Sequence, residues 1–503
     1  MSNTKPDSSQ VKFIPAGTSA VVTTVQDKLR ESVSVKDFGA LVDGTTDDTA
    51  AYLAALAAAS MVTIPAGTMI ISSVPVPTNR TIKGAGRNAT TIKLNAASNT
   101  ALHTIANVND VEFMDLTLNG NSTNNLTGGI GAYASGASSR IRFNNVRATD
   151  FRLAGIAAGP GTSHIEALNC QIDNNLMDGF QMTGVAYPSV LMSEVSNNVR
   201  YGAVFGSACA FVRNLGNVLH SNGQGGFIMV GGNDAVTAAN ISTANGGHGL
   251  QYNGTLRGTY TGNISTVNSG SGFDFTLGSS YGLATGNIGF QNSWRGVEVD
   301  SQSLHCSIVG NSFYQNYESG MTNFSSSECI YMGNQVVDNN LGNTTFSGID
   351  ITTDGVNPAN NILLLGNVAI GHGLHQAYGL NISSSSPESF GVIIDGNSFA
   401  GNAIGSVNLG TTTGVQAMNN LAWTTQAKGT GSIAAGATNS GPIAHGLALT
   451  PTYSSFVLEF ANGPAFAIGT VWIDNITATH FTVYCMTAPG GAGINFGWAA
   501  NKY

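Results

Sequence analysis

The chain has 503 residues, of which only 9% are charged and 64 are glycine. With 28 acids against 19 bases the formal net charge is −9, and no basic cluster is present, so the composition argues against a nucleic-acid partner. No run of 18 apolar residues occurs, which argues against membrane insertion. The N-terminal MSNTKPDSSQ lacks the apolar core of a signal peptide, so we expect a soluble chain whose export would need another route.

Residues 1–35 are polar apart from a weak β-like stretch, Ala20 to Thr24, and are typical of an attachment segment rather than a domain. Residues 36–61 contain DGTTDDTAAYLAALAAAS, which predicts a short helix. Thr46 or Asp47 is the expected N-cap, and Asp48 suits the positive end of the helix dipole. Because this helix is apolar on nearly every side, we expect it to be buried over the open N-terminal end of the domain that follows.

A glycine followed by a short apolar strand recurs every 23 or 24 residues, at Gly155, Gly179, Gly202, Gly226, Gly249, Gly272, Gly296 and Gly320. An asparagine nine or ten residues earlier keeps the same period, at Asn145, Asn169, Asn217, Asn240, Asn263, Asn287 and Asn311, with Ser193 in the one gap. A second asparagine follows five residues later, at Asn222, Asn245, Asn268, Asn292 and Asn316. These periods, without a helical apolar stripe, predict an all-β right-handed parallel β-helix over residues 62–423, in which stacked amides form ladders about 4.8 Å apart.

The repeat also sorts inward from outward positions, because side chains alternate across a strand. Positions one and three after each glycine are expected in the core, and position two is expected to face outward. The outward positions are Gln181, Val204, Ile228, Gln251, Asp274, Glu298, Thr322, Asp350 and Asn381. Three of these are acids within four consecutive coils, and Asp300 lies two residues beyond Glu298 on the same side.

Five cysteines lack CxxC or other metal-ligand spacing. Cys306 and Cys329 have equivalent places in successive coils and are expected to stack as packed core thiols rather than as a disulfide. His372 and His375 have no third ligand nearby in the repeat, so we interpret them as surface histidines of a loop. The last region, residues 424–503, alternates short strands with Gly, Pro and Asn turns, which predicts an antiparallel β-sandwich for trimerisation or glycan binding.

The outward acids favour glycoside hydrolysis, which needs one carboxyl group to protonate the leaving oxygen and one to activate water or attack carbon. The candidate catalytic residues are Asp274, Glu298, Asp350 and Asp300. Glu298 and Asp350 lie two coils apart, roughly 9.6 Å at the backbone, at the edge of the inverting range, whereas Asp274 and Glu298 lie one coil apart. The stereochemistry therefore stays open.

Side chains around these coils are candidates for substrate binding: Trp294, Tyr317, Arg295, Arg257, Tyr281 and His305. Several other interpretations of the acids and their neighbours remain open. The acids could be ordinary solvated residues or ligands of a bound Ca²⁺, although no metal or other cofactor is needed for hydrolysis. Elimination is another alternative, with Arg257 and Tyr281 beside a uronate, and a glycan-binding adhesin without catalysis is a third.

The segment TVQDKLRESVSVKDFGALVDGTTDDTAAYLAALAAA, followed by VTIPAGT and IKGAGRNATTIKL, resembles the start of bacteriophage tailspikes of the pectate-lyase-like superfamily. The resemblance covers residues 25–94 closely. It implies a homotrimeric virion spike that binds, and often depolymerises, capsule, exopolysaccharide or lipopolysaccharide O-antigen. It also implies synthesis in the host cytoplasm. Since the N-terminal segment is short, attachment to the phage tail is expected to need an adaptor protein.

Overall fold

The computed structural model describes residues 6–373, 375–383, 387–410, 414–460, 468–491 and 493–502. The chain divides into two compact units, Met1–Leu283 and Ala284–Tyr503, which are described separately. The N-terminal segment contains an antiparallel pair, β1 (Lys12–Phe13) and β2 (Thr23–Thr24), followed by helix α1 (Val25–Leu29) and the 3-10 helix η1 (Val35–Phe38). No helix of the described residues is long and apolar enough to cross a membrane.

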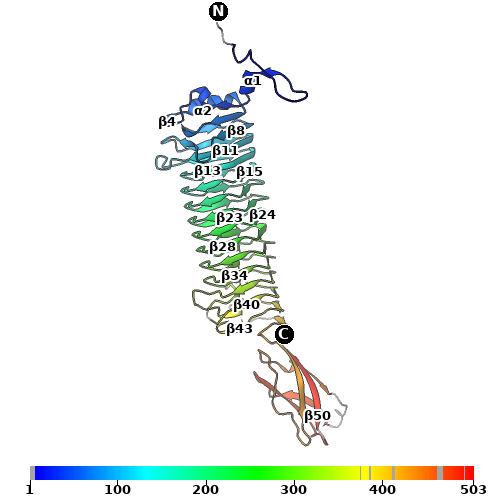
Figure 1. Cartoon of the computed structure of the whole chain (residues 1–503). Coiled ribbons are helices and arrows are strands. Elements are labelled where there is room, and N and C mark those ends of the chain that lie inside the picture. Colours follow the sequence, from blue (N-terminus) through cyan, green and yellow to red (C-terminus); the bar gives the residue numbers. More distant parts are fainter. Residues whose placement is uncertain are drawn as a thin grey trace, which may run out of the picture. The chain divides into compact units, whose positions relative to one another are not determined.

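The first unit is a parallel β-helix whose coils contribute strands to three sheets (Figure 1). Sheet I contains β7 (Val74–Pro75), β10 (Ala101–Ala106), β12 (Ile130–Ser135), β14 (Ile156–Ala158), β17 (Phe180–Met182), β20 (Tyr201–Phe205), β23 (Gly225–Val230), β26 (Leu250–Asn253) and β29 (Phe273–Thr276). Sheet II contains β3 (Val33–Ser34), β5 (Met61–Ile64), β8 (Arg80–Gly84), β11 (Asn109–Asn119), β13 (Ser139–Thr149), β15 (Ser163–Leu168), β18 (Ser189–Leu191), β21 (Arg213–Leu215), β24 (Asn233–Ala238) and β27 (Leu256–Thr261). Sheet III contains β4 (Asp43–Asp47), β6 (Gly67–Ile71), β9 (Thr90–Leu94), the second halves of β11 and β13, β16 (Gln171–Asp173), β19 (Glu194–Ser196), β22 (Val218–His220), β25 (Ile241–Thr243) and β28 (Ile264–Thr266).

The second unit continues with strands of the same three kinds, and β30 (Leu283–Thr285) spans the boundary. Its sheet I contains β32 (Val297–Val299), β35 (Met321–Phe324), β38 (Ile349–Thr352), β41 (Tyr378–Ile382) and β43 (Gly405–Leu409). Sheet II contains β33 (Ser307–Val309), β36 (Ile330–Met332), β39 (Leu363–Leu365), β42 (Ile393–Asp395) and β44 (Gln416–Met418). Sheet III contains β31 (Ile288–Phe290), β34 (Ser312–Tyr314), β37 (Gln335–Val337) and β40 (Val368–Ile370).

The C-terminal region forms two antiparallel sheets, as predicted for a β-sandwich. One sheet orders its strands β45 (Gln426–Ile433), β50 (Ile494–Asn501) and β47 (Phe456–Phe460). The other orders them β46 (Ile443–Ala444), β49 (His480–Cys485) and β48 (Val471–Asp474), and the 3-10 helix η2 (Tyr453–Ser455) precedes β47. Phe481, Phe496 and Trp498 are buried in its core, so these aromatic side chains stabilise the fold.

Helix α2 (Thr49–Ala58) is the predicted capping helix, and it packs against η1, β3 and β5 (Figure 1). The expectation that it is buried on all sides is wrong. Leu56 is buried but Leu53 is 39% exposed, because the helix lies across the first coils and only one face contacts them. The N-cap residue is Asp48, yet its carboxylate accepts from the N–H groups of Leu41 and Val42 rather than from the helix. Asp47 accepts the Thr49 N–H instead.

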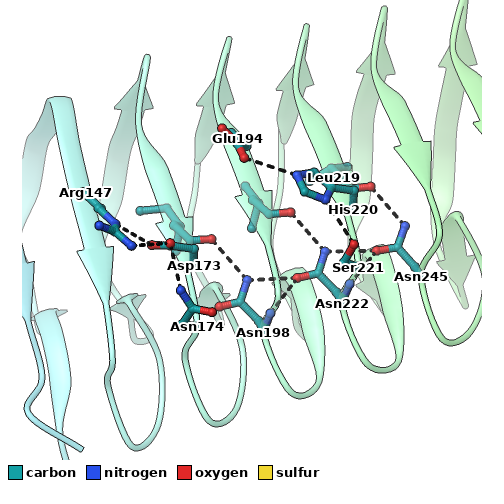
Figure 2. Close-up of polar contacts among 12 residues, drawn as sticks. Arg147, Asp173, Asn174, Glu194, Asn198, Leu219, His220, Ser221, Asn222 and Asn245 are labelled. Atoms are coloured by element: carbon teal, nitrogen blue, oxygen red, sulfur yellow. Dashed lines mark hydrogen bonds and ion pairs between the residues drawn. The ribbon is translucent and has the colours of Figure 1, made fainter.

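The predicted asparagine ladders are present in the turns of both units. In the ladder drawn in Figure 2, the Asn222 side chain donates to Val195 O (3.1 Å) and to Asn245 Oδ1 (3.0 Å), and its own Oδ1 accepts from Asn198. Each amide therefore bridges three coils and supplies an acceptor to a backbone N–H that has no strand partner.

Two asparagines predicted for the ladder that contains Asn217 do not belong to it. In that ladder, Cys170 and Ser193 precede Asn217. Asn145 and Asn169 lie instead at the neighbouring left-handed turn position, with φ of 53° and 52°. Asparagine is favoured at both positions, for different reasons. The predicted stacking of Cys306 and Cys329 is confirmed, since both are buried free thiols in contact.

The ladder predicts a sharp difference between two asparagine variants. Asn222→Ala removes the acceptor of two Asn198 N–H groups and the donor to Val195 O, so we expect it to lower the free energy of unfolding by about 3 kcal/mol or more. Asn169→Gly keeps the left-handed turn and should change the free energy of unfolding by less than about 0.5 kcal/mol. Urea unfolding followed by circular dichroism measures both, and equal midpoints would contradict the structural role of the ladder.

Candidate active site

A column of polar side chains runs across sheet I of the second unit. Glu298, Thr322 and Asp350 are in register on β32, β35 and β38, and Asn381 and Asn408 continue the column on β41 and β43. The register puts Glu298 and Asp350 on one face with a single strand between them, as the repeat predicted. Both are only 6% exposed, however, so the expectation of a solvent-facing column needs correction. Residues in the turn before each strand bind the carboxylates of Glu298 and Asp350 and cover them.

Arg295, in the turn before β32, binds two carboxylates. Its Nη1 lies 2.7 Å from Glu298 Oε1, and its Nη2 lies 3.0 Å from Glu318 Oε2. Burial of Arg295 acts against its charge, but the attraction of Glu298 and Glu318 outweighs burial and raises the pKa of the guanidinium. Arg295 therefore stays charged and fixes the two carboxylates around itself.

Glu318 is a site residue that the sequence reasoning missed. It lies in the turn before Gly320, one coil after Glu298 and one before Asp350, and its side chain is 24% exposed. Burial raises the pKa of the Glu318 carboxyl, Arg295 opposes the rise, and the charges of Glu298 and Asp350 add to it. The sequence did place an acid next to the candidate binding residue Tyr317. The prediction, however, used the alternation of side chains along strands, which does not apply to residues in turns.

Asp350 is held by three hydrogen-bond donors. The Ser319 hydroxyl and the Ser347 N–H (3.1 Å) both donate to Oδ2, and Asn381 Nδ2 donates to Oδ1 at 2.8 Å. Burial raises the pKa of the Asp350 carboxyl, although these donors and Arg295 act in the opposite direction. The site thus combines two carboxyl groups with raised pKa values, Glu318 and Asp350, and a third, Glu298, that is ion-paired to Arg295.

The aromatic candidates Trp294 and Tyr317 lie in the turns next to Arg295 and Glu318. They are 44% and 50% exposed, and the Glu318 N–H donates to Trp294 O at 3.0 Å, which joins the two turns. Asp300 follows the end of β32, where its carbonyl oxygen accepts from the Ser303 hydroxyl.

Three other predicted binding residues lie elsewhere in their coils. Arg257, Tyr281 and His305 have left-handed backbone, with φ of 59°, 56° and 55°, at or just before strands of the sheet II side. Arg257 forms a bidentate ion pair with Asp234 (2.5 and 2.8 Å), and His305 lies 2.9 Å from Glu328. These three residues lie on the sheet II side of their coils rather than with the acids of sheet I, because a position eight or nine residues after the repeat glycine is already on the next side of the coil.

Asp274 belongs to the first unit, on β29, and is 2% exposed. Gln251 Nε2 donates to its Oδ2 at 2.7 Å, and His248 Nε2 lies 3.9 Å from the same oxygen. The Ser271 N–H donates to His248 Nδ1 at 3.1 Å, so a neutral His248 carries its proton on Nε2, facing Asp274. The first unit thus has its own small polar cluster on sheet I.

The donor set does not suit the Ca²⁺ alternative. The carboxylates of Glu298 and Glu318 converge on the Arg295 guanidinium, and Asp350 is occupied by three donors, so a cation is already present where an ion would bind. Among the described residues, no three His, Cys, Asp or Glu side chains are grouped to hold a metal. His372 instead pairs with Asp338 at 2.7 Å, on the exposed surface.

Comparison with known sequences gives a family match and partial relatives. Residues 32–274 match the family described as rhamnogalacturonase A/epimerase, pectate lyase-like. Mannuronan C5-epimerases AlgE5 and AlgE3 of Azotobacter vinelandii are each 30% identical over 241 residues, which cover 43% of this chain. The match spans only 22% of AlgE5 and 12% of AlgE3, so the chain corresponds to a small part of these relatives.

Solved structures extend the likeness over most of the chain. Tailspike protein 3 of bacteriophage CBA120 superposes with a TM-score of 0.54 at 15% identity, covering 82% of this chain and 66% of that one. A double mutant of the tailspike of E. coli bacteriophage HK620 gives 0.52 at 12% identity, covering 98% of each chain. At these identities the likeness concerns the fold. The chain is therefore a parallel β-helix protein with a fold similar to that of these two phage tailspikes, and residues 32–274 are similar to the pectate lyase-like family.

Proposed function

We propose that this protein binds and depolymerises a bacterial surface polysaccharide by endo-glycosidic hydrolysis. The observation that carries the proposal is the pair Glu298 and Asp350, which face the same way from strands two apart around the fixed cation Arg295. Two strand spacings are about 9.6 Å at the backbone, and side chains that lean together fall in the range of roughly 6.5–9.5 Å used by inverting glycosidases. This geometry supports the inverting reaction.

In the proposed reaction Asp350 is the general acid and Glu298 the general base. Asp350 can hold a proton because burial raises its pKa, and it gives that proton to the glycosidic oxygen as the bond to carbon breaks. Glu298, which Arg295 holds in place at 2.7 Å, takes a proton from the water that attacks the opposite face of the sugar. Glu318 orients Arg295 from the coil between them and acts as a positioning residue.

The surroundings support a sugar polymer as the substrate. Trp294 and Tyr317 expose about half of their surface beside the carboxylates, where a ring face can pack against a sugar. The tailspike folds among the similar structures support a homotrimeric spike at the virion tail, released from the host cytoplasm with the phage. Capsule, exopolysaccharide and O-antigen all remain within this substrate class, and an adaptor protein remains our proposal for the link to the tail.

A second candidate is chemistry at C5 of a uronic acid, by elimination or epimerisation. It is favoured by the epimerase name of the matched family and by the Asp274, His248 and Gln251 cluster in the first unit. In that cluster Asp274 would be the base, because the Nε2 of a neutral His248 already carries a proton. The two reactions and simple adhesion leave different products, so one assay separates them.

We expect the protein to shorten a polysaccharide from a panel of purified capsules and O-antigens without forming unsaturated uronates. Size-exclusion chromatography measures chain length, and ultraviolet absorbance detects the double bond that elimination leaves. Shortening with absorbance would replace hydrolysis by elimination, and changed uronate composition at constant length would indicate epimerisation. Retention of polymer with none of these changes would leave an adhesin.

The carboxylate assignment predicts the effect of isosteric variants. Glu298→Gln and Asp350→Asn should each lower kcat by about 10³-fold, the range of a lost general acid or base, with little change in KM. Glu194→Gln is the matched control, since Glu194 is an exposed acid of sheet III paired with His220 in the first unit (Figure 2), and it should keep full activity. Full activity in both site variants would overturn the assignment.

The raised pKa of Asp350 predicts the alkaline side of the pH profile. A general acid works only while protonated, so activity should fall as pH rises through the pKa of Asp350. The Ser319 hydroxyl stabilises the ionised form, so Ser319→Ala should raise that pKa further and move the alkaline limb of kcat to higher pH. A limb that stays in place, or moves down, would show that another group donates the proton.

A further inference from the structure

A cavity of about 600 Å³ lies against sheet II of the first unit, over strands β8, β11, β13, β15 and β18 and the start of β21. None of the residues assigned to the reaction above lines it. Its volume is within the range of ligand sites, and six strands at about 4.8 Å spacing make it roughly 24 Å long. A groove of this length along the stacking direction suits a linear polymer better than a compact small molecule.

A column of charged and hydroxyl side chains crosses the groove in strand register. Glu112 and Glu166 flank Arg142, whose Nε lies 2.8 Å from Glu166 Oε1, and Ser189 and Arg213 follow. The register neighbours of Arg213 are the uncharged Ser189 and Val236, and within the described ranges no acid lies at ion-pair distance from it. Arg213 therefore presents an exposed guanidinium at one end of the groove.

A second column, of residues with left-handed backbone, runs beside the first. The His164 and Tyr187 rings stack at 4.7 Å, and the Tyr187 and Phe211 rings stack at 4.8 Å with 9° between their planes. Arg140, before them in the column, forms a bidentate pair with Asp110. Since the ring faces cover one another, the edges are exposed, and Tyr187 and Phe211 each expose 46% of their surface.

We propose that this groove is a second, non-catalytic binding site for a linear acidic polysaccharide, in which Arg213 binds a sugar carboxylate and the ring edges of Tyr187 and Phe211 contact the sugar. The planar fork of arginine matches a carboxylate, while Glu112, Glu166 and Ser189 offer hydrogen-bond partners to sugar hydroxyls. The site goes beyond the proposed hydrolysis and does not depend on it.

Affinity gel electrophoresis of the full chain, with polygalacturonate, alginate or neutral dextran in the gel, tests the proposal. We expect at least one polyuronate to retard the native protein and dextran not to. Arg213→Gln should raise the apparent Kd for that polyuronate about tenfold, the effect of losing one charge-assisted interaction, and Tyr187→Ala should weaken it as well. The control Arg152→Gln, at an exposed arginine outside the groove, should bind as the native protein does.

Three outcomes would overturn the proposal. They are no retardation by either polyuronate, equal retardation of Arg213→Gln and native protein, and a loss of oligomers in Arg213→Gln on sedimentation, which would make the groove an interface between copies. Glu298→Gln should be retarded like the native protein, because its defect lies in the reaction. Retardation by a polyuronate that depends on Arg213, together with no shortening of any polymer in the capsule and O-antigen panel, would therefore sink the proposed hydrolysis and leave the second site intact.

Discussion

The hydrogen-bonded amide ladder is the constraint on which the rest of this structure depends. A coil of 23 residues must turn sharply, and each turn leaves a backbone N–H without a strand partner. The stacked asparagines supply that partner, because one side chain accepts from the coil before it and donates to the coil after it, as Asn222 does between Asn198 and Asn245. The ladder therefore fixes where the coils that carry it turn, and with it the register of their strands.

Fixed register decides what the active-site cluster can be. Glu298, Glu318 and Asp350 occur in three successive coils, so their carboxylates are held within a few strand spacings and cannot all ionise freely in a buried place. Arg295 compensates two of them, and burial leaves Asp350 with a raised pKa. Burial raises the pKa of both Glu318 and Asp350, and a carboxyl group that keeps its proton to higher pH is what a general acid needs.

The period of glycine and asparagine was enough to predict the parallel β-helix, the inward residues and the shared face of Glu298 and Asp350. It could not separate ladder positions from the adjacent left-handed position, because asparagine suits both, and so Asn169 was misplaced by one residue. Alternation along a strand identifies the face on which a side chain lies but not the turn residues that cover this face, so the burial of Asp350 was missed. Glu318 was missed because it projects from a turn, where no alternation applies.

Charge is scarce in this chain, and its placement therefore carries information. Exposed ion pairs such as Asp110–Arg140 contribute little to stability, and uncharged residues such as Tyr187, Phe211 and Asn361 occupy the equivalent left-handed positions in other coils. Burying Arg295 with Glu298 is costlier still, because desolvation offsets much of the attraction. Neither the Asp110–Arg140 pair nor the Arg295–Glu298 pair therefore stabilises the fold much. Both, however, offer a charged or polar ligand a binding site that is already formed. The same reasoning, applied to sheet I of the second unit and to sheet II of the first unit, supports the two sites that we propose.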